Sequence, residues 1–131
     1  MIVKQVSVFV ENTVGRLADL TKILTDNNID LKASTIAETV DFGILRCIVE
    51  DPEKTVKILV ENGFSASISE VTGVSLEDKP GGLHKVLAVL AEAGIAVNYI
   101  YSTIKSAEGK AIIMMKTSDA AKAEEVLKAS G

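Results

Sequence analysis

The sequence predicts an α+β protein made of two repeated β-α-β-β-α-β units, with antiparallel sheets and the helices on one face of each sheet. Three observations predict this fold class. A shift of 66 positions superposes VSVFVENTVGRL, residues 6–17, on TGVSLEDKPGGL, residues 72–83. In both units, apolar residues recur first at every second position and then at helical spacing. The second unit stops after its second helical pattern, so we expect it to lack its last strand.

The repeat is supported by identical or similar residues at the same offset. Without any gap, Glu11 meets Glu77, Gly15 meets Gly81, Leu17 meets Leu83, Ile29 meets Ile95, Leu31 meets Val97, Gly43 meets Gly109 and Ile48 meets Met114. Matches of this kind at one fixed offset indicate a duplicated structural unit. We therefore divide the chain into a first domain, residues 1–70, and a second domain, residues 71–131.

The first strand and the first helix of each unit are predicted by hydrophobic periodicity. Val6, Val8 and Val10 alternate as in a half-buried strand, and Leu17, Leu20 and Leu24 then follow at helical spacing after Gly15. In the second unit Leu83, Val86, Leu87 and Leu90 form the corresponding helical face. A glycine between strand and helix predicts a tight turn at this point in both units.

Two strands and a second helix follow in the first unit. The strands are expected at residues 30–38 and 43–50, joined by a turn at 39–42, and their counterparts at 96–104 and 110–116, joined by a turn at 106–109. Asp51-Pro52-Glu53 predicts a capped helix start, and Ser118-Asp119 plays the same part downstream. Asn62-Gly63 predicts the helix stop.

The closing strand of the first unit is expected to run on into the second unit. Residues 65–76 contain no proline and only Gly73, so we predict one strand with a kink rather than a linker. Without a closing strand of its own, the second unit leaves the edge of residues 71–76 to be covered. Either a partner chain or a strand borrowed from the first unit could cover this edge.

Composition excludes several classes of function. With 131 residues, 47% of them hydrophobic, the chain can bury a core, and its net charge of −4 disfavours contact with nucleic acid. No apolar run is long enough to cross a membrane and no signal segment is visible, so we expect a cytoplasmic protein. Cys47, the only cysteine, lies in an apolar run and is expected in the core; with His84 as the only histidine, we expect no metal and no cofactor.

The pattern of the strand, the glycine turn and the helix resembles the ACT domain. The first unit carries it as Asn12-Thr13-Val14-Gly15-Arg16-Leu17 with Asn28-Ile29-Asp30-Leu31, and the second as Asp78-Lys79-Pro80-Gly81-Gly82-Leu83 with Gly94-Ile95-Ala96-Val97. The resemblance covers nearly the whole chain and is closest to small proteins made of two ACT domains. It implies ferredoxin-like units and a regulatory role in binding small molecules, usually amino acids, at interfaces between paired domains. It also implies a metabolic enzyme as a partner and assembly as a homodimer.

The resemblance places the candidate ligand-binding residues at the two glycine turns. These are Glu11, Asn12, Thr13, Val14, Gly15, Arg16, Leu17 and Asp30 in the first unit, and Asp78, Pro80, Gly81 and Gly82 in the second. Physically, a glycine turn before a helix presents free N–H groups to an anion such as a carboxylate. Asn12 and Asp30 can grip the ammonium group if the helix returns the chain beside its start.

The two turns differ in the residues that could anchor a ligand. Asp30 of the first unit corresponds to Ala96, so the second unit lacks one polar anchor, and we expect the first unit to hold the better site with the second supplying a wall. Losing such a hydrogen bond costs about 1–3 kcal/mol. Val14 stands where the family usually has proline. Arg16 either lies in solvent or contacts the ligand carboxylate, and Asn12 is equally compatible with a helix cap.

Two alternatives remain open at this point. In the first, the units form a ligand-independent structural or oligomerisation module that associates with a metabolic enzyme. In the second, the fold supports catalysis, because ferredoxin-like sheets also hydrolyse acyl phosphates and carry metals. A single cysteine excludes a metal-transfer pair, and the turn from Asn12 to Arg16 fits an acyl phosphatase poorly. We therefore expect no catalytic residue and no enzyme activity.

Overall fold

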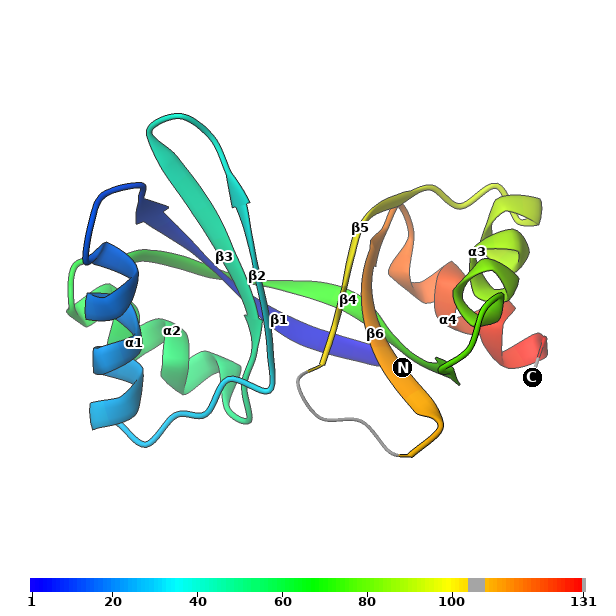
Figure 1. Ribbon diagram of the computed structural model, residues 1–131, viewed down its shortest axis with the longest axis horizontal. Helices are drawn as coiled ribbons and strands as arrows, with labels where there is room; N and C mark the ends of the chain where they lie inside the picture. Colours follow the sequence, from blue (N-terminus) through cyan, green and yellow to red (C-terminus); the bar gives the residue numbers. More distant parts are fainter. Residues whose placement is uncertain (104–107, 131) are drawn as a thin grey trace. The chain divides into compact units, whose positions relative to one another are not determined.

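The computed structural model describes residues 1–103 and 108–130, and its elements follow the predicted order (Figure 1). The elements are β1 (Ile2–Glu11), α1 (Arg16–Asp26), β2 (Ala33–Glu38), β3 (Phe42–Ile48), α2 (Pro52–Glu61), β4 (Ser65–Glu77), α3 (Gly82–Glu92), β5 (Val97–Ser102), β6 (Lys110–Thr117) and α4 (Ala120–Ala129). The chain separates into two compact units, Lys4–Ser69 and Met1–Val3 with Glu70–Gly131. The division at residues 70 and 71 into two domains stays a prediction.

The first unit, Lys4–Ser69, arranges its strands in the order β2-β3-β1-β4. β1 and β3 are antiparallel, with Val8 opposite Leu45, and β2 pairs antiparallel with β3. Alternate residues of β1 are buried against α1 and α2, where Leu20, Leu24 and Leu59 lie in the same core as Val6 and Val8. Both helices cover one face of the sheet. The alternate residues of β1 that do not face the helices therefore point to the other face, and Phe9 among them is 53% exposed.

The second unit repeats this arrangement with the strand order β1-β4-β6-β5. β4 and β6 are antiparallel, with Val74 opposite Ile113, and β5 pairs with β6 across an irregular register near Val97. Its core contains Leu90, Ile95, Met115 and Ala123, and α3 and α4 lie on one face of these strands (Figure 1). The predicted fold class, with two β-α-β-β-α-β units and one-sided helices, is thus confirmed.

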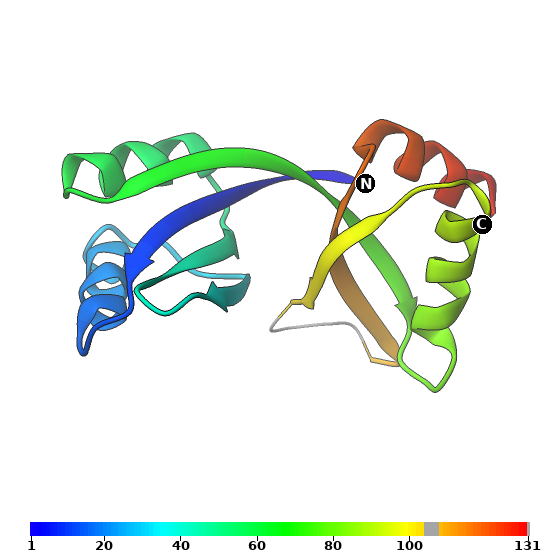
Figure 2. The ribbon, with the colours of Figure 1, turned by 90° about the horizontal axis from the view of Figure 1, so that it is seen from above.

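The first residues of the chain complete the second unit. Met1–Val3 cluster with Glu70–Gly131, and Figure 2 shows the start of β1 beside β4. The Met1 ammonium group donates to the Gly73 carbonyl oxygen at 3.0 Å, and the Gly73 N–H donates to the Met1 carbonyl oxygen at 2.6 Å. A strand borrowed from the first unit therefore covers the edge that has no closing strand of its own. This is one of the two covers that the sequence left open.

Most helix ends were predicted correctly. The Asp51 side chain accepts from the Lys54 N–H at 3.1 Å and the Asp119 side chain from the Lys122 N–H at 3.0 Å, so both carboxylates cap their helices. Gly63, with φ of 87°, ends α2 in the left-handed region. β4 runs without a break from Ser65 to Glu77, as expected.

Several strand boundaries were wrong by one to three residues. β2 begins at Ala33 and not at residue 30, because Ile29 and Asp30 belong to the connection in which the Ile29 N–H donates back to the Leu24 carbonyl oxygen at the helix end. β3 spans Phe42–Ile48, and β5 begins at Val97. Residues 104–107, which include the end predicted for that strand and the first half of the turn predicted at 106–109, lie outside the described residues.

The repeat has an insertion that the gapless comparison missed. Val6 pairs with Cys47, and its counterpart Thr72 pairs with Met115, so the offset is 66 in the first strands but 68 in the strands they pair with. The structural counterpart of Gly43 is therefore Ala111, and not Gly109. The apparent match at Gly109 arose because glycines recur near hairpin turns, and a sequence comparison alone gives them undue weight.

Three further expectations concern single residues and the membrane. Cys47 is 1% exposed, and burial raises the pKa of its thiol to about 12, so it is an inert core residue as predicted. His84 is exposed. Among the described residues, no helix is both long enough and apolar enough to span a bilayer.

Candidate functional site

The turn between β1 and α1 is held by backbone bonds to the β2–β3 connection. The Asn12 N–H donates to the Asp41 carbonyl oxygen at 3.0 Å, and its side-chain Nδ2 donates to the Val40 carbonyl oxygen at 3.5 Å. The Thr13 N–H donates to the Glu11 carbonyl oxygen at 2.9 Å. Gly15 then takes the N-cap position of α1 with φ of 85°, and no side chain caps this helix. Asn12 is therefore not a helix cap.

A pocket of about 380 Å³ lies beside this turn. It is lined by Val10, Glu11, Asn12, Thr13, Leu17, Ile36, Glu38 and Gly43. Leu17 and Ile36 give it apolar walls, since they are 40% and 43% exposed, whereas Glu11 and Glu38 give it negative charge. Leu17 was expected on the buried face of α1, but its position over the pocket leaves it accessible. The turn thus offers an acidic and partly apolar site, suited to a ligand with an ammonium group.

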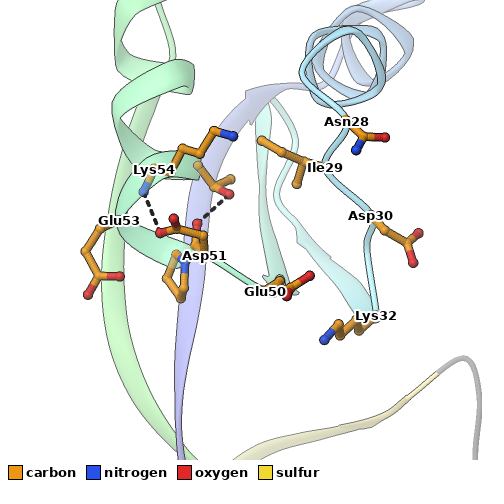
Figure 3. Close-up of a pocket in the computed structure, with 10 residues that line it drawn as sticks. Asn28, Ile29, Asp30, Lys32, Glu50, Asp51, Glu53 and Lys54 are labelled. Carbon is orange, nitrogen blue, oxygen red and sulfur yellow. Dashed lines mark hydrogen bonds between the residues drawn. The ribbon is translucent and has the colours of Figure 1, made fainter.

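Asp30 lies at the opposite end of α1 and lines a different pocket. This pocket of about 640 Å³ is formed by the connection after α1 and the start of α2, and its lining residues are Asn28, Ile29, Asp30, Lys32, Glu50, Asp51, Pro52, Glu53, Lys54 and Thr55. Figure 3 shows Asn28 and Asp30 facing away from Asp51, which caps α2. Glu53 is paired with Lys4 at 2.6 Å, which lowers the pKa of its carboxyl group.

Asn12 and Asp30 do not converge within the first unit. α1 has 11 residues, and at 1.5 Å per residue it separates its two ends by about 16 Å. Asn12 precedes this helix and Asp30 follows it, so each lines a pocket that excludes the other. We expected the two residues to meet if the helix returned the chain beside its start. The helix does not do so.

Arg16 packs against an aromatic side chain. Its guanidinium carbon lies 4.1 Å from the centroid of the Phe64 ring, a distance typical of a cation–π contact. Phe64 is 5% exposed and belongs to the first core, so Arg16 covers the end of this core between α1 and β4. Both residues, with Glu11, line a small hollow of about 200 Å³. Arg16 is therefore half-buried. From the sequence we expected either a solvent-exposed side chain or a contact with the ligand carboxylate, and neither describes this packing.

The turn between β4 and α3 has the same backbone design. The Asp78 N–H donates to the Gly109 carbonyl oxygen at 3.1 Å, as Asn12 does to Asp41, and Gly81 takes the N-cap position with φ of 91°. Pro80, Gly81 and Gly82 line a pocket of about 440 Å³, but Asp78 lies outside it. A side chain at Gly82 would overlap the Glu77 carbonyl oxygen, so only glycine fits this tighter turn.

Sequence reasoning missed the lysines at the second turn. Lys79, Lys85 and Lys110 line the 440 Å³ pocket together with Glu77. The sequence repeat could have revealed one of them. At the offset of 66, Lys85 takes the place of Asp19, so a cation replaces a carboxylate in the first turn of the helix. Among the described residues no group of three or more His, Cys, Asp or Glu side chains could hold a metal ion.

Two β-α-β-β-α-β units, each with a glycine at the start of its first helix, define a tandem α+β domain of the ferredoxin-like type. The sequence matches the family model described as the ACT domain pair over residues 1–130. The chain therefore belongs to the ACT domain pair family, and the resemblance seen in the sequence is confirmed.

Solved structures of other proteins share this fold. The crystal structure of protein BT0572 from Bacteroides thetaiotaomicron is 43% identical, with a TM-score of 0.92, and the match covers 99% of this chain and 89% of that one. The regulatory subunit of aspartate kinase from Thermus thermophilus, in its ligand-free form, is 14% identical with a TM-score of 0.69, over 95% and 90% of the two chains. The corresponding subunit from Thermus flavus is 16% identical with a TM-score of 0.66, over 96% and 88%. No curated protein sequence matches the chain.

Proposed function

We propose that this protein is a regulatory sensor that binds an amino acid and has no catalysis of its own. The observation that carries the proposal is the membership of residues 1–130 in the ACT domain pair family, together with a glycine turn of the same backbone design in both units. The regulatory subunits of aspartate kinase that share the fold support a partner that is a metabolic enzyme.

The amino-acid site that we propose uses the pocket beside the first turn. Glu11 and Glu38 provide negative charge for the ligand ammonium group, Leu17 and Ile36 contact its side chain, and the start of α1 receives its carboxylate. Asn12 lies on the rim of this pocket. Of the residues proposed in the second unit, Pro80, Gly81 and Gly82 line a pocket of that unit, and Asp78 stands between two further lining residues, Glu77 and Lys79.

Asp30 joins the same site from a second copy of the chain. Since about 16 Å of helix separates Asn12 from Asp30 in one unit, a ligand that uses both must lie between two domains. A homodimer in which each copy lends its Asp30 to the other gives two such sites related by symmetry. This arrangement keeps both anchors that the resemblance implies and explains why one unit does not contain them together.

The first test is thermal unfolding of the protein with each common amino acid. Binding at a hundredfold excess over the dissociation constant adds about 2.7 kcal/mol of stability, which raises the Tm of a chain of this size by several degrees. We expect one amino acid, or one chemical group of them, to give this rise. Asn12→Ala and Asp30→Ala should each abolish it. Asn62→Ala is the matched control, because its Nδ2 likewise donates to a backbone carbonyl, that of Ile58 at 2.8 Å, and Asn62 lines neither the pocket of Asn12 nor that of Asp30.

A mixture of the two variants tests whether the site is shared. If each site combines Asn12 of one copy with Asp30 of the other, a heterodimer of Asn12→Ala and Asp30→Ala chains contains one intact site and one that lacks both residues. Titration calorimetry of the mixture should then show up to one bound ligand per heterodimer, which is half a ligand per subunit. If the mixture recovers nothing while both single variants still dimerise, the shared site is wrong. A flat amino-acid panel would favour the ligand-independent oligomerisation module.

A further inference from the structure

The pocket of the second unit combines apolar walls with an excess of positive charge. It has a volume of about 440 Å³ and lies between the end of β4, the start of α3 and the end of α4. Its apolar residues are Val74, Leu76, Val86, Val89 and Leu127, and its charged residues are Glu77, Lys79, Lys85 and Lys110. A volume of this size is in the range of pockets that hold small organic ligands.

The lysines outnumber the single carboxylate that faces them. Glu77 forms an ion pair with Lys79 at 2.6 Å. This pair, helped by the more distant Lys110 and Lys85, lowers the pKa of the Glu77 carboxyl group. Within residues 1–103 and 108–130, Lys85 and Lys110 form no ion pair of their own. The pocket therefore carries two positive charges that its own side chains do not neutralise, and an anion would neutralise them.

The position of Lys85 is unfavourable for the isolated protein. It lies in the first turn of α3, where the helix dipole disfavours a cation, and Asp19 holds the same place in α1. The apolar walls are equally incomplete. Val86, Val89 and Leu127 are only half-buried, whereas Leu20, the counterpart of Val86, is 0% exposed. Both features cost stability unless a bound molecule supplies negative charge and apolar surface at this place.

We propose that this pocket binds a small anionic amphiphile, with a carboxylate or phosphate head at Lys85 and Lys110 and an aliphatic body against Val86, Val89 and Leu127. The site lies within the second unit, and it differs from the proposed amino-acid site in its unit, its charge and its lining residues. It therefore does not depend on the proposed function. An amino acid with a polar side chain would leave the apolar walls uncovered and would bring an ammonium group to the lysines.

Methyl-resolved NMR titrations of the full chain test this proposal with four probes. Octanoate and octyl phosphate combine head and body, acetate offers the head alone, and 1-octanol offers the body alone. We expect saturable shifts of the Val86, Val89 and Leu127 methyl signals with octanoate, octyl phosphate or both, and at least about tenfold weaker binding of 1-octanol and acetate. The tighter of the two anionic probes identifies the head group as carboxylate or phosphate.

Variants separate the charge from the cavity. The double variant Lys85→Gln and Lys110→Gln should raise the Kd of the anionic probe about tenfold without changing the fold, because both side chains are exposed. Lys57→Gln, an exposed lysine of the first unit, is the matched control and should leave the Kd unchanged. Val89→Phe places a ring in the cavity and should abolish binding, with the methyl signals of Ile95 and Met115 in the second core showing that this unit remains folded.

Three results would overturn the proposal. The first is 1-octanol binding as tightly as octanoate and octyl phosphate, which would show that the lysines are irrelevant. The second is the absence of saturation by either anion with a Kd below about 1 mM. The third is binding that survives Val89→Phe in a folded chain. Asn12→Ala should leave the Kd of the anionic probe unchanged. The experiment can therefore contradict the amino-acid site and the anion site independently of each other.

Discussion

The two units share a backbone but differ in how their interiors are filled. In both, a glycine in the left-handed region starts the first helix and an aspartate caps the second. In the first unit, Phe64 and Arg16 close the open end of the core. In the second, Gly82 stands at the place of Arg16, and the pocket there has a volume of about 440 Å³, against about 200 Å³ for the hollow beside Arg16 and Phe64. The shared turns and helix caps therefore give both units the same fold. A few side chains decide how much of the space at this end of each unit is filled.

The largest expected difference between the units lies in their cores. Leu20→Ala should lower the free energy of unfolding by about 3 kcal/mol, because Leu20 is 0% exposed and its loss leaves a cavity. Val86→Ala, at the counterpart position, should cost about 1 kcal/mol, since Val86 is already half-buried beside open space. Urea unfolding of both variants measures the difference. Equal costs would show that the second core is as tightly packed as the first.

The borrowed strand gives the next largest effect. Deleting residues 1–3 removes both hydrogen bonds between Met1 and Gly73 and the Val3 side chain that lies beside Gly73, at a cost of about 2 kcal/mol. Hydrogen exchange should become faster in β4 after Glu70 and in β6, whereas amides of α1 should keep their protection. Uniform acceleration throughout the chain would show instead that both units unfold together.

Alkaline pH should affect the first core more than the second. Burial raises the pKa of Cys47 from 9.0 to about 12, whereas its counterpart in the second unit, Met115, does not titrate. A group whose pKa is higher in the folded state stabilises the fold below its unfolded pKa, and this stability is lost as pH rises from 9 towards 12. At pH 10 the loss is about 1.4 kcal/mol.

Cys47→Ala provides the control for this titration. The variant should be less stable at pH 7, because it loses buried volume, but its stability should change less between pH 8 and 10. Urea midpoints measured at several pH values give this comparison. An identical alkaline decline in both proteins would assign the effect to other groups.

The smallest expected effect concerns the first turns of α1 and α3. Asp19→Lys should destabilise the protein by about 0.5 kcal/mol, because a cation replaces an anion near the positive end of the dipole. Lys85→Asp should stabilise it by a similar amount in the absence of ligand, since it also reduces the charge excess of the second pocket. Thermal unfolding at low salt shows both changes. Adding about 0.5 M salt should reduce them, and an effect that salt leaves unchanged would have another cause.

Much of the architecture could be read from local patterns. The alternation of Val6, Val8 and Val10 and the spacing of Leu20 and Leu24 fixed the first strand and the buried face of α1, as burial confirms. The offset of 66 was correct for the first strands and helices but became 68 at β6. A small insertion near a hairpin leaves periodicity intact on both sides, so only strand pairing reveals it.

The candidate site was less predictable because it depends on distance. Asn12 and Asp30 were grouped by their positions on either side of one helix, yet that helix is about 16 Å long and the two residues line different pockets. The packing of Arg16 on Phe64 joins residues from opposite ends of the first unit. Lys79 and Lys110, 31 positions apart, line one pocket because β4 and β6 pair. Contacts of this kind follow from how strands pair, which a local pattern does not encode.

The sequence by itself determined the elements of this protein, their order, the glycine turns, the aspartate caps and the family, because each depends on residues within a few positions of one another. Only the tertiary structure decided that Met1–Val3 cover the edge of β4, that Asn12 and Asp30 lie apart, and that three lysines share a cavity with apolar walls. The physical reason is that strand pairing and core filling join residues far apart in the chain, and their outcome depends on which surfaces remain to be covered once the local elements have formed.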